Sequence, residues 1–485
     1  MGMTVRVGFV PSVRSRGRAA ASWYLKMRQD SLDALAKVPG LEVIAPQAAA
    51  LGTSPDAEQG VTEEGVVATL DEAEGLAAFF QRQKVDALIL CPLNFGDERS
   101  AVKVAEILRV PVLLYATKEP PVPDDVSLAR LSDSYCGNLS MASGLYRRKI
   151  PFHFAGLFFP DEPAFAQEVE TFVRAVSVVK GLKGARLGQV GVRPPTFETV
   201  GYDETALIQK FGQNVIYANM ADIVDRALAL QEDDPAVQGT MAAIRAGVAE
   251  ITVAEDYIRK AARLEVALAE FWKANRLSAM AVQCWPSIQR MMGLSVCAVF
   301  GRLTGQGMLT ACEVDILGAL SMLVNYRAAL GETLPHFVDW TIQHRENPNW
   351  LLAWHCGNAP VSLACDPART ALRSRRDMCG ANPPQEGDVQ AGLYQFQVKA
   401  GPVTFTRLAE YDGQWKMLIA RGEIVPSQET LAGTWAWVAV PDHARLYRTL
   451  IEEGFVHHAS MIHGDQTAAL LEACKFLGIH PVVVG

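Results

Sequence analysis

Residues 87–115 read ALILCPLNFGDERSAVKVAEILRVPVLLY, and this stretch decides the fold class of the N-terminal part of the chain. Two short apolar runs, at residues 87–91 and 110–115, enclose a segment with helical spacing at residues 100–108. A strand, a helix and a second strand in this order form a βαβ unit, whose strands lie parallel in one sheet. The stretch therefore predicts a doubly wound α/β domain.

The residues on the N-terminal side of this stretch repeat the pattern. Residues 5–11, VRVGFVP, are expected to be a buried strand, with helices over residues 19–36 and 72–84. Ligands of such sheets bind beside the loops at the carboxyl ends of the strands. The loop after residues 87–91 carries Asn94 and Asp97 and is a candidate substrate loop, although a turn with a helix cap is an equally good interpretation.

The rest of the chain contains two further segments with different predicted secondary structure. A second α/β segment is predicted from strand-like runs at residues 185–192, 214–217 and 277–288, from helical spacing over residues 222–277, and from a helix that Glu313 opens. Further on, strand-like runs separated by Gly, Pro and Asp lie at residues 349–363, 393–398, 405–411, 414–421 and 434–439, before a helix over 466–477. We therefore expect two doubly wound α/β domains, at residues 1–155 and 156–342, followed by a β-rich C-terminal domain at residues 343–485.

Charge and composition exclude several classes of partner. The 485-residue chain is 49% hydrophobic and has a formal net charge of −8, without a long run of Lys or Arg. This balance argues against nucleic acid, whose binding depends on clustered cations. No stretch approaches the roughly 18 apolar residues of a membrane span, and the first residues lack the pattern of a signal peptide. A cytoplasmic protein that binds a small neutral or anionic molecule is expected.

Cysteines and glycines are uninformative as motifs. The nine cysteines form no C-x-x-C pair, so we expect reduced thiols. The glycines form neither a dinucleotide-binding fingerprint nor a phosphate-binding loop. The segment most similar to either motif is Gly305-Gln306-Gly307, which lacks the remaining residues of both. The sequence also contains no G-x-S-x-G elbow and no H-E-x-x-H helix. Nucleotide cofactors, hydrolase chemistry and a zincin site are therefore not favoured.

Two acids and two histidines stand out as a candidate metal site: Glu313, Asp339, His355 and His458. Carboxylates suit hard cations, whereas zinc sites favour Cys and His, and the two imidazoles shift the preference towards Mn²⁺ or Co²⁺. We expect Mn²⁺, with Co²⁺ and Mg²⁺ as alternatives. The remaining histidines, among them His336, are expected to be structural.

Two neighbouring residues leave this ligand set ambiguous. His457 precedes His458, and adjacent side chains on a strand point in opposite directions, so only one of them should enter the site. Asp315 lies two residues after Glu313, and within a helix the two would face different ways. Only one acid of that pair should be a ligand.

Around these residues the chain resembles the superfamily of L-fucose isomerase and L-arabinose isomerase, and specifically its shorter, divergent L-fucose isomerase-like members. The resemblance covers the whole length, and its most specific pieces are RPPTFETVGYDE (193–204), QCWPSI (283–288), GRLTGQGMLTACEVDILGALSM (301–322), HFVDW (336–340), WHCGNAP (354–360) and HHASMIHGD (457–465). By family position, Glu313 and Asp339 are the metal carboxylates and His458 is the C-terminal metal histidine. His355 stands where the arabinose-type enzymes have a further ligand.

The resemblance also implies an architecture and contacts. It implies three domains assembled as trimers or hexamers, with the N-terminal domain of a neighbouring subunit closing each pocket. Arg16, Asn94 and Asn138 would then contact the sugar of a neighbouring subunit, and Trp285 would form an apolar wall. For Trp285 a buried core position is an equally good interpretation.

The reaction that the resemblance implies is reversible aldose–ketose isomerisation of an open-chain sugar through a cis-enediol. Glu313 and Asp339 would move the protons while a bound cation polarises the carbonyl. Two alternatives remain open: a non-catalytic sugar-binding or regulatory protein, and a metal-dependent epimerase or lyase of a sugar acid or a sulfo sugar. The sequence does not identify the sugar.

Overall fold

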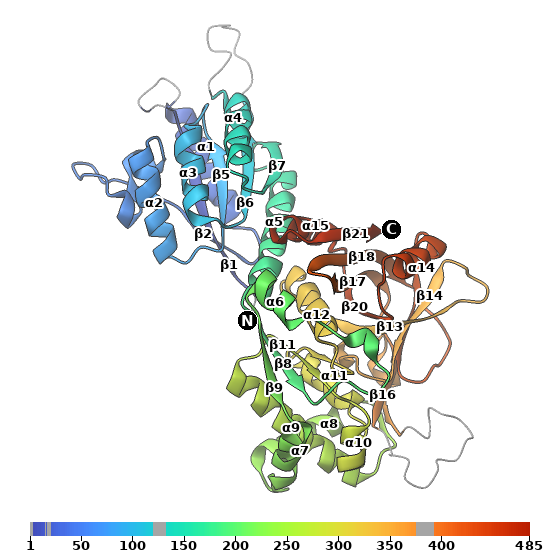
Figure 1. Ribbon diagram of the computed structural model, residues 1–485. Coiled ribbons are helices and arrows are strands. Elements are labelled where there is room, and N and C mark those ends of the chain that lie inside the picture. The colour runs from blue at the N-terminus through green and yellow to red at the C-terminus, as the bar shows by residue number, and fades with distance from the viewer. Residues whose placement is uncertain (1–2, 15, 17–20, 120–131, 375–391) are drawn as a thin grey trace. The chain divides into compact units, whose positions relative to one another are not determined.

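The computed structural model describes residues 3–14, 16, 21–119, 132–374 and 392–485 of the chain, which divides into two compact units. The first unit comprises residues 1–180 and 471–477, and the second comprises residues 181–470 and 478–485 (Figure 1). Both units mix helices with parallel sheet, and the second also contains a large mixed sheet. The α/β class is thus confirmed at this level, while the division into three domains stays a prediction.

The first unit is built on a parallel sheet of five strands in the order β2-β1-β5-β6-β7. Its strands are β1 (Val5–Ser12), β2 (Leu41–Ile44), β5 (Ala87–Pro92), β6 (Val112–Thr117) and β7 (Phe152–Phe158), beside a small pair of β3 (Gln47–Ala48) and β4 (Val61–Thr62). Its helices are α1 (Ala21–Leu35), α2 (Leu70–Arg82), α3 (Glu98–Leu108), α4 (Ser134–Arg147) and α5 (Pro163–Leu182).

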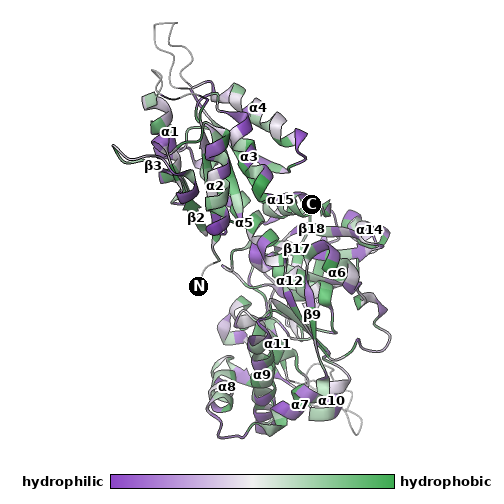
Figure 2. Cartoon of the chain, turned by 60° about the vertical axis from the view of Figure 1, so that its left-hand side comes forward, coloured by the Kyte–Doolittle hydropathy of each residue, from purple (hydrophilic) through white to green (hydrophobic). Residues whose placement is uncertain are grey.

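These elements confirm the strands expected at residues 5–11, 87–91 and 110–115 and the helices that follow them. Every residue of β5 and β6 is buried, which explains why these strands appear in the sequence as continuous apolar runs. Along α2 and α3, green and purple residues alternate in Figure 2, as expected of helices with one face on a sheet. The predicted helix over residues 19–36 is present from Ala21, and residues 19 and 20 lie outside the described part of the chain.

The second unit contains a parallel sheet of four strands in the order β12-β11-β8-β9. These strands are β8 (Arg186–Val190), β9 (Asn214–Ala218), β11 (Ala279–Val282) and β12 (Thr310–Ala311). The helices along this stretch are α6 (Glu204–Phe211), α7 (Met220–Ala229), α8 (Pro235–Ala246), α9 (Glu255–Asn275), α10 (Ser287–Met292), α11 (Cys297–Gly305) and α12 (Ile316–Ala328). The β11 and β12 strands end at the same edge of the sheet, where the loop before α12 begins.

The large sheet of the second unit has ten strands in the order β10-β15-β16-β19-β14-β13-β20-β17-β18-β21. They are β10 (Glu250–Ile251), β13 (His336–Gln343), β14 (Trp350–His355), β15 (Ala371–Arg373), β16 (Leu393–Gln397), β17 (Gly401–Tyr411), β18 (Gln414–Ile424), β19 (Thr434–Ala439), β20 (His458–His463) and β21 (His480–Val484). Two further helices, α14 (His443–Glu452) and α15 (Thr467–Leu477), follow β19 and β20. The β-rich character expected of the C-terminal region is confirmed.

The structure corrects the helix predicted to open at Glu313, and it adds strands that the sequence analysis did not predict, among them β13 and β20. The helix expected to open at Glu313 begins at Ile316, because Asp315 caps it and the two residues before Asp315 have left-handed backbone. Neither β13 nor β20 was predicted as a strand. Polar residues interrupt the apolar residues of both strands, His336 and Asp339 on β13 and two histidines on β20, yet the strands lie next to each other in the ten-stranded sheet.

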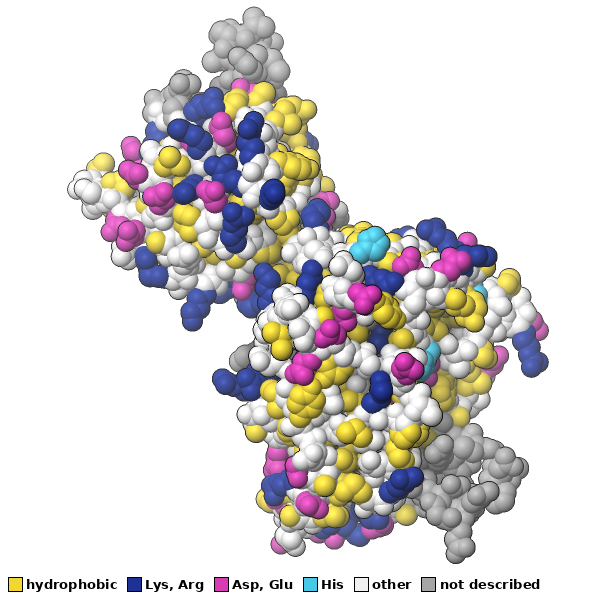
Figure 3. Space-filling model, in the orientation of Figure 1, with side chains coloured by type: hydrophobic (Ala, Val, Ile, Leu, Met, Phe, Trp, Pro, Cys, Tyr) yellow, Lys and Arg dark blue, Asp and Glu magenta, His cyan; other side chains and the backbone are white. Residues whose placement is uncertain are grey.

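The surface carries charged side chains of both signs. On the face shown in Figure 3, Lys and Arg side chains are interspersed with Asp and Glu. Among the described helices none is long and apolar enough to cross a membrane.

The first sheet supplies a stability prediction. Leu88 lies on the central strand β5 and is completely buried, so Leu88→Ala should lower the free energy of unfolding by about 2–5 kcal/mol, through lost apolar burial and the cavity left behind. Urea denaturation followed by far-ultraviolet circular dichroism measures this change. Leu51→Ala is the matched control, because Leu51 is fully exposed. Equal denaturation midpoints for the two variants would contradict the described core.

Candidate active site

Three of the four predicted ligands come from three neighbouring strands of the ten-stranded sheet. Asp339 on β13 lies directly opposite His458 at the start of β20, and it also lies opposite Trp354 on β14, next to His355. Directly opposite residues of an antiparallel pair project to the same face, with their Cβ atoms roughly 5 Å apart. The register of the sheet therefore brings the carboxylate and the imidazole together.

Glu313 reaches the same place from the other sheet of the second unit. It follows β12 in a loop where Glu313 and Val314 both have positive φ, of 53° and 61°. Such backbone costs about 1–3 kcal/mol per residue for side chains other than glycine, so the surrounding structure must hold it. The Val314 N–H donates to the Val282 carbonyl, and the Asp315 N–H donates to the Cys312 carbonyl. This tight loop points the Glu313 carboxylate at the strands that carry Asp339 and His458.

The side-chain atoms of this group face one another at close range. Nε2 of His458 lies 3.6 Å from Oδ1 of Asp339 and 3.8 Å from Oε2 of Glu313. These separations are longer than hydrogen bonds. Both oxygen atoms are buried and have no hydrogen-bond partner in the described part of the chain. Two unpartnered buried carboxylate oxygens beside an imidazole nitrogen fit the donor set of a divalent cation.

Asp315 holds His458 in the orientation that this donor set requires. Its carboxylate is fully buried, pairs with Arg407 on β17, and accepts a hydrogen bond from Nδ1 of His458 at 2.8 Å. Because Nδ1 carries the proton, Nε2 keeps a free lone pair that points to Glu313 and Asp339. Burial alone would raise the pKa of Asp315, but Arg407 and His458 hold it well below its ordinary value. Asp315 is therefore a permanently charged partner of the ligand and faces away from the donor set.

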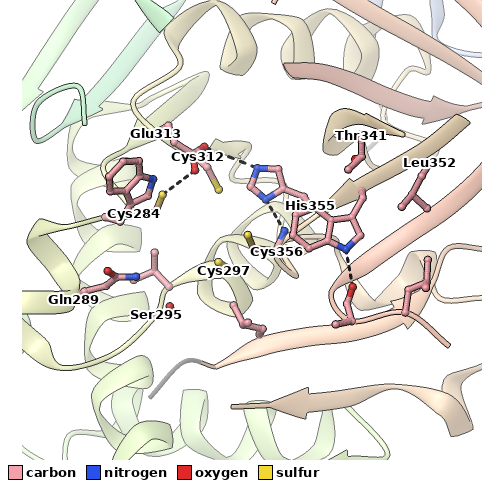
Figure 4. Close-up of a pocket in the computed structure, with 16 residues that line it drawn as sticks. Cys284, Gln289, Ser295, Cys297, Cys312, Glu313, Thr341, Leu352, His355 and Cys356 are labelled. Carbon is pink, nitrogen blue, oxygen red and sulfur yellow. Dashed lines mark hydrogen bonds and ion pairs between the residues drawn. The ribbon is translucent and has the colours of Figure 1, made fainter. Parts of the chain in front are cut away.

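His355 is held differently from His458. Its Nδ1 accepts a hydrogen bond from the backbone N–H of Cys356 at 2.9 Å. In a neutral imidazole this bond assigns the proton to Nε2, which lies 3.9 Å from Oε2 of Glu313 (Figure 4). His355 thus faces the carboxylate as a donor. Its role as a fourth metal ligand, which needs a free lone pair on Nε2, stays a prediction.

The carboxylates of the site favour protons in the absence of a cation. Burial raises the pKa of Glu313 well above its ordinary value, the Cys284 thiol adds to this shift, and His355 opposes it. Burial also raises the pKa of Asp339, against the effect of His355 and His458. Burial disfavours the charged form of His355, and although Asp339 and Glu313 act to raise its pKa, the Cys356 N–H that donates to Nδ1 leaves no place for a second ring proton, so this imidazole is neutral. A bound dication would replace these protons as the counter-charge.

A pocket of about 750 Å³ opens beside Glu313 and His355. Most of its lining is apolar or aromatic and includes Trp285 and Trp354, and the described lining residues include no Lys or Arg. The lining comprises Cys284, Trp285, Gln289, Ser295, Val296, Cys297, Cys312, Glu313, Thr341, Leu352, Trp354, His355, Cys356, Leu393, Leu431 and Ala432 (Figure 4). A pocket with one polar wall and several apolar walls is typical of a small-molecule site.

The predicted substrate contacts divide between the two units. Trp285 lines the pocket, and its ring lies 5.4 Å from that of Phe197. The other three belong to the first unit. The Arg16 guanidinium pairs with Glu72. The Asn94 side chain accepts hydrogen bonds from the backbone N–H of Gly96 in its own loop and from that of Arg14, which follows β1. Asn138 is buried on α4. A role in substrate binding for Arg16, Asn94 and Asn138 remains a prediction.

The choice of His458 over His457 as the metal ligand stays a prediction, but the reason given for it, that the two side chains point in opposite directions, is wrong. His458 is buried beside Glu313, whereas the neighbouring His457 is exposed. However, the two rings do not point in opposite directions, because their centroids are only 4.1 Å apart. His457 precedes the first residue of β20, so the alternation of a strand does not apply to it.

Sequence reasoning missed the residues that support the ligands. Arg407 gave no signal, since an Arg within an apolar strand pattern has no recognisable spacing to Asp315. The pocket cysteines were noted only as reduced thiols. Asp315 was recognised as an alternative to Glu313, and its place one residue before α12 was the available sign of a helix cap.

Comparison with protein families gives two matches. The model described as the fucose/sulfoquinovose isomerase N-terminal domain matches residues 42–183, and the model described as the L-fucose isomerase C-terminal domain matches residues 353–484. Glu313 and Asp339 lie between the two matched regions, and His355 and His458 lie within the second.

Full-length relatives agree with these matches. The chain is 29% identical to a sulfoquinovose isomerase of Alkalicoccus urumqiensis over 84% of this chain and 89% of that protein. It is 25% identical to a sulfoquinovose isomerase of Priestia aryabhattai over 87% of this chain and 91% of that protein. A solved periplasmic solute-binding protein of Actinobacillus succinogenes 130z with bound D-allose aligns with 68% of this chain and 92% of its own, at 11% identity and a TM-score of 0.17. That score is too low to support a shared fold.

The support that Asp315 gives to His458 can be tested by metal binding. Asp315→Asn offers an amide to Nδ1 of His458 and so favours the proton on Nε2, where it blocks a cation. We expect Mn²⁺ affinity to fall by roughly 10- to 100-fold, the usual effect of losing an outer partner of a metal-binding histidine. Calorimetric titration of metal-free protein measures the affinity. Asp442→Asn, at the cap of α14, is the control, and unchanged binding in Asp315→Asn would refute the assignment.

A second prediction concerns acid stability. His336 is buried beside Thr434, and burial lowers its pKa to about 3, whereas the unfolded chain binds this proton below its ordinary pKa of about 6.5. The contribution of His336 to the free energy of unfolding is therefore fully present above pH 6.5 and is lost as the pH falls below that value. When the pH falls from 7 to 5, the free energy of unfolding of His336→Asn should decrease by about 2 kcal/mol less than that of the unaltered protein.

Urea denaturation of the metal-free protein at each pH measures this difference. Thr434→Val is the matched control, because it removes the hydroxyl that contacts Nε2 of His336 and keeps the imidazole. It should retain the pH dependence of the unaltered chain. The same pH dependence in His336→Asn would show that this histidine is not the group responsible.

Proposed function

The chain belongs to the fucose isomerase-like family and is an aldose–ketose isomerase, and from this premise we propose that it isomerises an open-chain sugar held by a divalent cation on Glu313, Asp339 and His458. One observation carries the proposal: two buried carboxylate oxygens without a partner face the free Nε2 of an imidazole whose tautomer is fixed by Asp315. The family assignment sets the non-catalytic alternative aside.

Mn²⁺ is the first candidate for the cation, with Co²⁺ and Mg²⁺ as alternatives. Two carboxylates suit any of these ions, and the imidazole favours Mn²⁺ or Co²⁺ over Mg²⁺. When bound, such an ion supplies Lewis-acid polarisation of the sugar carbonyl. Arg407 already neutralises Asp315, so the charges of Glu313 and Asp339 are the ones left for a dication to balance.

The chain's own residues then move the protons. One of the two carboxylates, Glu313 or Asp339, takes the proton from C2 of the aldose, and the released electron pair forms the C1–C2 double bond of a cis-enediol as O1 gains a proton. Return of a proton to C1 and loss of the O2 proton complete the ketose. Burial raises the pKa values of both acids in the metal-free site, and a bound cation would offset this effect and keep the carboxylates in the charged form that a general base requires.

His355 is placed to assist at an oxygen atom. Its Nε2 proton points towards Glu313 at the edge of the pocket, so it can donate a hydrogen bond to a sugar hydroxyl or carbonyl bound there. The apolar walls, including Trp285 and Trp354, would limit the access of water to the enediol.

Sulfoquinovose is the first substrate to examine. The relatives from Alkalicoccus urumqiensis and Priestia aryabhattai are named sulfoquinovose isomerases, and the chain aligns with most of their length. One observation favours a second candidate, an uncharged sugar such as a 6-deoxy hexose. The described lining of the pocket provides no Lys or Arg to balance a sulfonate.

Other parts of the proposal follow the family resemblance. We infer a trimer or hexamer in which the N-terminal domain of a neighbouring subunit closes the pocket, and Arg16, Asn94 and Asn138 are the contacts proposed for that domain. An Arg brought by a neighbour would supply the charge that a sulfonate needs. A cytoplasmic location remains part of the same proposal.

A sugar panel in D₂O tests the reaction. Mn²⁺-loaded protein is incubated with pentoses, hexoses, 6-deoxy sugars and 6-sulfo sugars, and the products are analysed by NMR. Isomerisation through an enediol yields a ketose with deuterium at C1, whereas an epimerase leaves deuterium in an aldose and forms no ketose. We expect the ketose, and a product formed without any ketose would reject the proposal in favour of an epimerase or lyase.

Matched variants test the two acids. Glu313→Gln and Asp339→Asn should each fold, as judged by circular dichroism, and should no longer bind the metal. The turnover number should fall at least about 100-fold, which is the usual minimum effect of removing a general acid–base group. Near-normal turnover in either variant would show that the carboxylate has neither role.

A further inference from the structure

Four cysteines line the pocket, and the proposed reaction uses none of them: Cys284, Cys297, Cys312 and Cys356. The sequence analysis expected reduced thiols without assigning them a role, and the structure describes them as free cysteines. Their concentration beside one catalytic carboxylate is a feature of the fold.

The strands β11 and β12 bring two of these thiols together. The two strands pair in parallel, with Met280 opposite Thr310 and Ala281 opposite Ala311. Cys312 directly follows β12, and Cys284 lies two residues beyond β11. Since the carboxyl ends of parallel strands meet at one edge, both side chains emerge at the same place.

Glu313 lies between these thiols and the histidines. Cys284 Sγ donates to Oε1 of Glu313 at 3.2 Å, while Oε2 faces His355 (Figure 4). Oε2 is also the oxygen that faces His458. Ligand atoms of Cys284, Cys312 and Glu313 all lie within 4.8 Å of one another. The two oxygens of one carboxylate therefore face two different donor sets.

We propose that Cys284, Cys312 and Oε1 of Glu313 form a second cation site, selective for thiophilic divalent ions such as Zn²⁺ or Cd²⁺. Two sulfurs and one oxygen are a donor set for a soft or borderline ion, whereas the set on the other side of Glu313 is dominated by carboxylates. Mg²⁺ and Mn²⁺ prefer the oxygen-rich side. The two sites thus differ in the class of ion that they take.

The local geometry suits this assignment. All three residues are buried, and tetrahedral zinc with Zn–S bonds of roughly 2.3 Å needs donor atoms close to the separations already present. The Asn358 amide donates to Cys312 Sγ at 3.6 Å and would stabilise its thiolate. The pocket leaves an open side for a fourth ligand such as water.

Occupation of the second site has a consequence for the first. A thiophilic ion on Oε1 would fix the Glu313 carboxylate on the sulfur side and withdraw its charge from the hard-ion site. This consequence rests on the proposed function, because it assumes that Glu313 takes part in turnover. The binding of the ion does not depend on that assumption.

Cobalt spectroscopy tests the binding. Reduced full-length protein, freed of metal and then saturated with Mg²⁺, is titrated with Co²⁺, and the near-ultraviolet thiolate-to-cobalt charge-transfer band is recorded. We expect the band in the unaltered chain. Cys284→Ser and Cys312→Ser should each weaken binding at least tenfold, since even loss of an outer partner costs roughly 10- to 100-fold, and the double variant should lack the band.

Cys297→Ser is the matched control, because Cys297 lines the same pocket and lies outside the proposed donor set. It should keep the band. Absence of the band in the unaltered chain, its loss in Cys297→Ser, or its persistence in the double variant would each overturn the assignment.

A measurement without substitutions guards against variants that fail to fold. ¹¹³Cd NMR of the unaltered protein should show a resonance shifted strongly downfield by two sulfur ligands, and a shift typical of oxygen and nitrogen ligands alone would overturn the site. Isomerisation of sugars by the Mn²⁺-loaded protein is measured separately. A protein that isomerises sugars without a thiolate signal therefore disproves this site and leaves the proposed function intact.

Discussion

The buried carboxylate of Asp315 is the constraint on which the site depends. It caps α12 through the Gly318 N–H, pairs with Arg407 on β17, and accepts the Nδ1 proton of His458. The helix α12, the strand β17 and His458, the proposed ligand, are thus fixed by one side chain. Burying this charge costs several kcal/mol unless it is fully paired, and removal of one partner of a buried pair typically costs about 3–5 kcal/mol. The same interactions that make the arrangement stable therefore also fix the free lone pair of Nε2.

Much of this architecture could be predicted from local pattern. Apolar runs such as residues 87–91 are readable because both faces of the strand are buried, so every position must be apolar. Glu313, Asp339 and His458 were found through chemistry and family resemblance, since hard cations need carboxylates. The structure brings these three together. Trp285 lines the pocket beside Glu313, and its role as a wall for the sugar stays a prediction.

The parts that could not be predicted depend on long-range contacts. Arg407 meets Asp315 across 92 residues, and no local spacing reports such a pair. The strand β13 mixes polar and apolar residues, among them Asp339, and its place in the sheet follows from its pairing with β14 and β20. The position of the Glu313 carboxylate depends on two consecutive left-handed residues without glycine, a conformation that sequence propensity disfavours. Tertiary hydrogen bonds impose it.

Asp339 and His458 lie directly opposite each other on β13 and β20, so the proposed site forms only when these two strands pair in the correct register. Strand side chains alternate with a period of two, so a slip of β20 by one residue would turn His458 to the other face of the sheet. A chain misaligned in this way would still be compact, but it would lack a donor set for a cation. Metal loading would then discriminate between correctly and incorrectly registered chains, and ion binding would stabilise only the correct register through mass action.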